Sequence, residues 1–118
     1  MTVHERVVGD VTILEVDGRM TVDAQGDVRL RIEVRRLLQQ GRKRFVLHLE
    51  RVPQMDSSGL CDLVTAHTAA MRRDGWLKLL HLSPRVRDLL AVTKLLTVLE
   101  VFDSEADAVA SFGPASSI

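Results

Sequence analysis

The residues best placed to support chemistry lie together in residues 55–60, which read MDSSGL. This segment stands between an apolar run at 45–49 and a stretch of helical periodicity, so it is expected to join a buried strand to a helix. Functional sites in open α/β sheets lie at such strand ends. Capping the helix needs only Asp56 or Ser57. The hydroxyl of Ser58 is therefore open to a partner or to phosphorylation, which would add about −1.5 to −2 charge.

Signs of enzymatic or metal chemistry are weak elsewhere in the chain. The seven glycines form no nucleotide-binding motif, and the four histidines match no metal-ligand spacing. A serine hydrolase centred on Ser58 would lack the usual GxSxG elbow. Cys61 and His67 stand six residues apart, which places them on different faces of a helix. We therefore expect no catalytic residue, no metal site and no cofactor.

Composition points to one soluble domain of ordinary globular type. The chain has 118 residues, 46% of them hydrophobic, and 16 basic residues balance 16 acidic ones. This balance argues against a domain that binds nucleic acid over its whole surface. A single cysteine, together with no secretory leader and no apolar stretch of spanning length, leads us to expect a cytoplasmic protein without membrane insertion.

Local basic charge is concentrated in the first half of the chain. One interpretation is a surface for nucleic acid or lipid headgroups. The other is a solvated helix end, offset by Asp27 and Glu33, and the neutral net charge favours it. The basic residues concerned are Arg29, Arg31, Arg35, Arg36, Arg42, Lys43 and Arg44.

The elements that must position residues 55–60 follow an alternating pattern. A hairpin of strands at 3–8 and 11–16 is followed by a helix that starts near Asp23, and the runs at 45–49 and 76–82 predict central strands. A helix opens at Ser83 and Pro84, a short strand covers 99–102, and a last helix starts at Asp103 or Ser104. The order ββαβαβαβα predicts one α/β domain over residues 1–118, with a frayed tail at 115–118.

Helical spacing also predicts which side chains face the core. For the helix after residue 56, the expected inner face is Leu60, Leu63, Val64, His67 and Met71, with Cys61, Asp62 and Thr65 outward. The inner residues expected for the other helices are Leu30, Val34, Leu37 and Leu38 in the first, Val86, Leu89, Leu90 and Thr93 in the third, and Ala106, Val109, Ala110 and Phe112 in the last.

Residues 55–60, in this order of elements, resemble the signature of STAS domains, specifically the single-domain anti-sigma factor antagonists of bacteria. The resemblance extends over nearly the whole chain and includes residues 16–19, 45–49, 86–95 and 101–108. It implies a mixed, mostly parallel five-stranded sheet with helices chiefly on one side. Two departures stand out: Cys61 and Asp62 follow the motif, and Lys94 stands where the family commonly has glycine.

The resemblance also implies a function. Members of this family bind an anti-sigma factor, usually a kinase of the GHKL type that phosphorylates a serine of the motif, and a PP2C-type phosphatase reverses the modification. By position in the motif, the phosphoacceptor would be Ser58. The partner-binding residues would be Asp56, Ser57, Ser58, Gly59 and Asp62, with a homodimer left open. The alternative is a docking subunit of a lipid or solute transport complex that is not phosphorylated.

Overall fold

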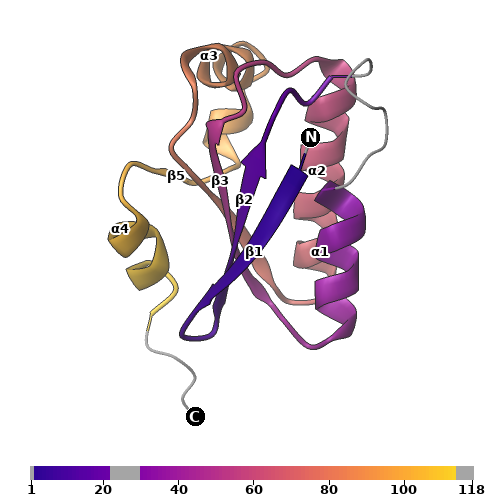
Figure 1. Ribbon diagram of the computed structural model, residues 1–118, viewed down its shortest axis with the longest axis vertical. Helices are drawn as coiled ribbons and strands as arrows, with labels where there is room; N and C mark the ends of the chain where they lie inside the picture. Colours follow the sequence, from indigo (N-terminus) through magenta and orange to yellow (C-terminus); the bar gives the residue numbers. More distant parts are fainter. Residues whose placement is uncertain (1, 22–29, 114–118) are drawn as a thin grey trace.

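A five-stranded sheet forms the centre of the computed structural model, which describes residues 2–21 and 30–113 (Figure 1). Its first two strands form an antiparallel hairpin in which Val8 pairs with Val11, and the remaining neighbours are parallel. The spatial order follows the chain: β1 (Thr2–Val8), β2 (Val11–Asp17), β3 (Arg44–Arg51), β4 (Trp76–Leu80) and β5 (Val101–Phe102). The predicted fold class and the central position of β3 and β4 are confirmed.

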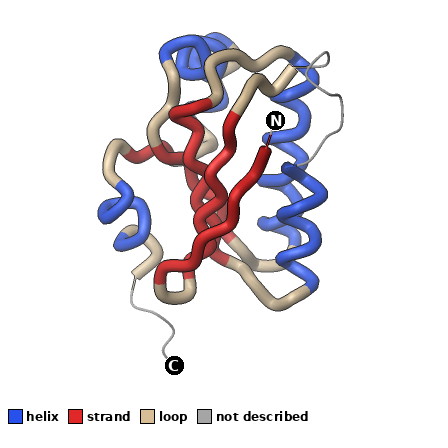
Figure 2. Tube along the Cα trace, in the orientation of Figure 1, coloured by secondary structure: helices blue, strands red, loops and turns tan. Residues whose placement is uncertain are grey.

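The helices are distributed unequally over the two faces of the sheet (Figure 2). Helices α1 (Leu30–Gln39) and α2 (Ser57–Arg72) run along one face, and α4 (Glu105–Ala110) lies on the other (Figure 1). Helix α3 (Pro84–Val92) and the 3₁₀ turn Leu95–Thr97 pack at the end where the parallel strands finish. The expectation that helices lie chiefly on one side is confirmed. Asp23 and Asp27, the expected start of the first helix, and the tail at 115–118 lie outside the described residues.

The core has a large layer under α1 and α2 and a small one under α4. Phe45, Leu47 and Leu63 are fully buried in the large layer, while Val46 contributes to the small one. Strand β3 therefore sends apolar side chains to both faces, as its unbroken apolar run predicted. All four residues expected to face inward from α1 are buried.

The predicted inner face of α2 is correct for Leu63 and partly correct for Leu60 and His67, which are half-buried, but it is wrong for Val64 and Met71. Val64 and Met71 are 36% and 41% exposed, whereas small side chains and Asp62 meet the sheet and α1. Small residues let the helix approach closely, and the flanking larger residues lie at the margin of the contact. The buried residues of α2 are Gly59, Asp62, Leu63, Ala66 and Ala70.

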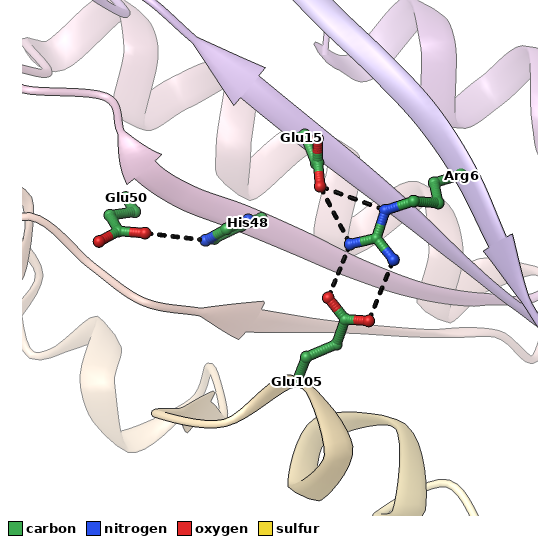
Figure 3. A network of polar contacts seen from close by, with 5 residues as sticks. All are labelled: Arg6, Glu15, His48, Glu50 and Glu105. Carbon is green, nitrogen blue, oxygen red and sulfur yellow. Dashed lines mark hydrogen bonds and ion pairs between the residues drawn. The ribbon is translucent and has the colours of Figure 1, made fainter.

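Helix α4 is fastened to the opposite face at both of its ends. The Arg6 guanidinium donates two hydrogen bonds to Glu105, at 2.6 and 3.0 Å, and two more to Glu15 on β2 (Figure 3). Because the charged form of Glu105 accepts these bonds, its pKa lies below its usual value. At the other end, Lys78 Nζ donates to Ser111 Oγ at 2.9 Å.

The remaining predicted faces are partly correct. In α4 the buried residue is Ala108, with Val109 and Phe112 half-buried, so the expectation for Ala106 and Ala110 is wrong. Ser104 caps this helix as predicted, through the backbone N–H of Asp107. In α3, Val86 and Leu90 are buried and Leu89 is half-buried, but Thr93 is exposed.

Candidate functional site

The motif lies in a loop that two backbone contacts hold at the carboxyl end of β3. Met20 donates its backbone N–H to Gln54 at 2.9 Å, and Asp56 donates its own to Met20 at 3.2 Å. Met20 and Met55 form an isolated parallel bridge, and both side chains are buried. The loop that follows β2 therefore fixes the path of residues 54–56 into α2.

Asp56, one of the two residues expected to cap α2, is its N-cap. Its backbone is extended, and its side chain accepts a hydrogen bond from the Gly59 N–H at 3.1 Å. Since Asp56 satisfies this helix end, neither serine hydroxyl is needed for capping. Ser57 and Ser58 are exposed, and neither side chain makes a hydrogen bond within the described part of the chain.

Gly59 is required by the close approach of the Met20 loop. A Cβ at this position would lie 2.1 Å from the Met20 carbonyl oxygen and 2.7 Å from its Cβ, which no side chain can tolerate. The glycine is therefore buried beneath the loop, unlike the serines before it. Because Gly59 has no side chain, the start of α2 packs directly against the Met20 loop, and Ser58 lies on the exposed side of the helix.

Asp62 is not on the exposed surface, and the prediction that it faces outward is wrong. It is 4% exposed, and its carboxylate accepts hydrogen bonds from the backbone N–H groups of Leu30 and Arg31, at 3.3 and 3.0 Å. It thus binds the first amides of α1 from a neighbouring helix. Desolvation by burial raises the pKa of this carboxyl group, and the two backbone hydrogen bonds oppose the rise.

The site that emerges is a small exposed surface, and the described part of the chain places no cluster of reactive groups around it. Cys61 is exposed one turn from Ser57, and its Sγ lies 4.0 Å from Thr65 Oγ1. His67 is half-buried, which lowers its pKa, and it makes no contact with Cys61. Within residues 2–21 and 30–113, no group of three or more His, Cys, Asp or Glu could hold a metal ion.

The sequence indicates the motif, but it gives no sign of Met20, and the role expected for Asp62 is wrong. Met20 lies far from the motif in sequence, and only the fold brings its carbonyl against Gly59. The role of Asp62 had a weak signal: it lies on the same helix face as the small residues Gly59, Ala66 and Ala70, which are buried. A polar residue on the narrow face of a helix indicates a buried hydrogen bond.

Comparison with known proteins agrees with this arrangement. The STAS domain family model matches residues 2–108. Among curated proteins, the chain is similar to BtrV of Bordetella bronchiseptica, whose name describes it as an anti-sigma factor antagonist. The two are 28% identical over 108 residues, which are 86% of this chain and 93% of BtrV.

Solved structures show the same fold at low sequence identity. SpoIIAA, described as an anti-sigma factor antagonist in its unphosphorylated form, matches with a TM-score of 0.77 at 20% identity, covering 98% of this chain and 100% of its own. Its phosphorylated form, from Bacillus, matches with a TM-score of 0.71 at 20% identity over 94% and 99% of the two chains. A sulfate transporter family protein from Wolinella succinogenes matches with a TM-score of 0.69 at 23% identity, over 90% and 87%.

Proposed function

The chain belongs to the STAS domain family, and we propose that it is an anti-sigma factor antagonist whose contact surface is the exposed start of α2. The relationship to BtrV supports this role, because the similarity covers most of both chains. The partner is an anti-sigma factor of the GHKL kinase type, and its binding releases a sigma factor. The antagonist itself contributes no catalytic group.

The observation that carries the proposal is the state of the two serines. Both serines are exposed, and among the described residues their hydroxyls have no hydrogen-bond partner, while Asp56 caps the helix. Because Asp56 already caps the helix, neither hydroxyl is needed to stabilise the start of α2. Asp56, Ser57 and Ser58 form the proposed contact surface, and Gly59 shapes it from beneath. Asp62, being buried, links α2 to α1 beneath this surface and does not contact the partner directly.

Phosphorylation of Ser58 is the proposed switch. A phosphate near a helix N-terminus is electrostatically favourable by about 0.3–1 kcal/mol, so the domain should stay folded. The modified surface must nevertheless accommodate a dianion and its hydration shell beside Asp56. Binding is therefore lost through repulsion and desolvation at the interface, and a PP2C-type phosphatase restores it.

A static docking role in a transport complex is the alternative. The fold that the chain shares with a transporter family protein is compatible with it. In such a complex the same helix start would bind its partner without modification. The two functions differ in what a permanent negative charge at residue 58 should do, and a binding measurement separates them.

The test is calorimetric titration with the anti-sigma factor captured from the native cytoplasm. Wild type and Ser58→Ala should bind alike, and Ser58→Asp should bind at least about tenfold more weakly, which corresponds to about 1.4 kcal/mol. Thr68→Asp, which adds the same charge at an exposed position further along α2, is the matched control and should behave as wild type. All four proteins should have the same melting temperature. Equal binding of Ser58→Asp and wild type would contradict the switch and favour static docking.

A further inference from the structure

The end of the molecule opposite the start of α2 concentrates basic side chains. Three turns meet there: Gly9–Asp10, residues 40–43 and residues 73–75 (lower end of Figure 1). The backbone N–H of Trp76 donates to the Lys43 carbonyl at 2.8 Å, which holds two of these turns together. We define the basic end as Arg42, Lys43, Arg44, Arg72 and Arg73.

Most of the charge at the basic end is not neutralised by the residues that the structure describes. Lys43, Arg72 and Arg73 are exposed, and their charged groups have no hydrogen-bond or ion-pair partner among the described residues. The only acidic residues in the three turns are Asp10 and Asp74, and Asp10 pairs with Arg44 at 3.3 Å. Basic residues therefore outnumber acidic ones at this end, which is positively charged. Since the net charge of the whole chain is zero, the rest of the molecule carries an equal excess of negative charge.

A shallow hollow and an exposed aromatic residue adjoin at this end. The hollow, of about 320 Å³, is lined by Arg42, Lys43, Arg44, Gly41 and Asp10. Next to it, Trp76 is 52% exposed and is the register partner of Arg44. Arg44 also lines a second hollow with Trp76 and Phe112. Basic side chains thus lie beside an exposed aromatic residue at this end of the molecule.

We propose that the basic end docks on an anionic lipid surface. Basic residues near such a surface are attracted to it, and tryptophan favours the boundary between headgroups and acyl chains. Arg72 and Arg73 lie at the carboxyl end of α2, where positive charge interacts favourably with the helix dipole, so their positions have a structural explanation without a lipid. The helix dipole does not explain Lys43 or the exposure of Trp76.

Docking by this end is peripheral and leaves the proposed contact surface free. None of the helices in the described parts of the chain is long and apolar enough to cross a bilayer. Single-stranded nucleic acid is the less favoured partner, because Trp76 is the one exposed residue among the Phe and Trp residues that the structure describes, which leaves no series of rings for stacking bases. The start of α2 would point away from the lipid.

The test uses Trp76 as its own reporter, since it is the only tryptophan in the chain. The full chain is titrated with vesicles of phosphatidylcholine, with and without phosphatidylserine, at low and physiological salt. We expect a blue shift of the Trp76 emission and co-sedimentation only with phosphatidylserine, both weakened by salt. Lys43→Gln with Arg73→Gln should lower the apparent partition constant by about tenfold or more.

The matched control replaces two exposed arginines away from the basic end, Arg35→Gln with Arg85→Gln, and should bind vesicles as wild type does. Equal far-ultraviolet circular dichroism spectra and melting temperatures check that both variants fold. The proposal is overturned by any of three results: no phosphatidylserine-dependent shift, equal loss in the two double variants, or binding to single- or double-stranded DNA but not to vesicles.

Discussion

Asp62 is the residue that joins the helix bearing Ser58 to its neighbour. Its carboxylate accepts hydrogen bonds from two backbone N–H groups at the first turn of α1, and both belong to residues more than 30 positions away. Such amides have no partner within their own helix. A single side chain of α2 therefore binds the first described turn of α1 to the helix that carries the proposed contact surface.

Replacing Asp62 should be costly because its partners stay buried or half-buried when it is removed. Asp62→Ala is expected to lower the free energy of unfolding by about 1–3 kcal/mol, measured by urea denaturation. Cys61→Ser, at the adjacent exposed position, should change it by less than about 0.5 kcal/mol. If the two variants lose equal stability, the buried contact is not what holds the helices together.

Lys94 is the opposite case, because its side chain makes its backbone conformation less stable. Its φ of 64° lies in the left-handed region, where glycine has no steric penalty. Lys94→Gly is therefore expected to raise the free energy of unfolding by about 1 kcal/mol in the same assay. Asp88→Gly, within α3, should lower it by a similar amount. A loss of stability in Lys94→Gly would mean that the lysine side chain contributes more than the strain it causes.

At the scale of elements, α4 depends on one ion-pair network for its attachment at the amino end. Arg6 holds Glu105 from β1 while also binding Glu15 on β2. The pKa of Glu105 is lowered, chiefly by its hydrogen bonds to Arg6, so its contribution to stability is present above the ordinary pKa of 4.5. That contribution is lost as the pH falls through the lowered pKa.

This pH dependence can be isolated with a variant. Glu105→Gln should lower the free energy of unfolding near pH 7 by less than about 1 kcal/mol, because the pair is partly exposed to solvent. The difference from wild type should shrink as the pH is lowered below 4.5. Asp107→Asn, on the same helix, makes no ion pair in the described part of the chain and serves as the control. A difference that stays constant with pH would contradict the assignment.

The strands and their order could be predicted because their signals are local. The apolar run at 45–49 and the Gly9–Asp10 turn indicate a buried strand and a hairpin without reference to the rest of the chain. The inner face of α2 could not be predicted in the same way. Leu60, Val64, His67 and Met71 have helical spacing, and only close packing against the sheet and α1 selects the small residues beside them.

In the candidate site, too, the features set by local sequence could be predicted, and those set by contacts between distant segments could not. The cap at Asp56 and the exposure of Ser58 follow from the order of residues at a helix start, so the sequence indicates them. The burial of Asp62 depends on a hydrogen bond to α1, and the need for glycine at 59 depends on the Met20 loop. Both are contacts between distant segments, which no local pattern records.

At the scale of the whole molecule, the two proposed surfaces lie at opposite ends of the strands. The start of α2 follows the carboxyl end of β3, and the basic end surrounds the amino ends of β3 and β4 (Figure 1). The sheet between them is buried on both faces at β3. A lipid surface and an anti-sigma factor would therefore not compete for the same part of the protein.

The most direct test of the central proposal is the location of the phosphate. The chain is incubated with its cognate kinase and ATP, and the modified peptide is sequenced by mass spectrometry for wild type, Ser57→Ala and Ser58→Ala. We expect phosphate on Ser58 in wild type and in Ser57→Ala, and none in Ser58→Ala. Phosphate on Ser57 alone, or on neither serine, would contradict the proposed switch.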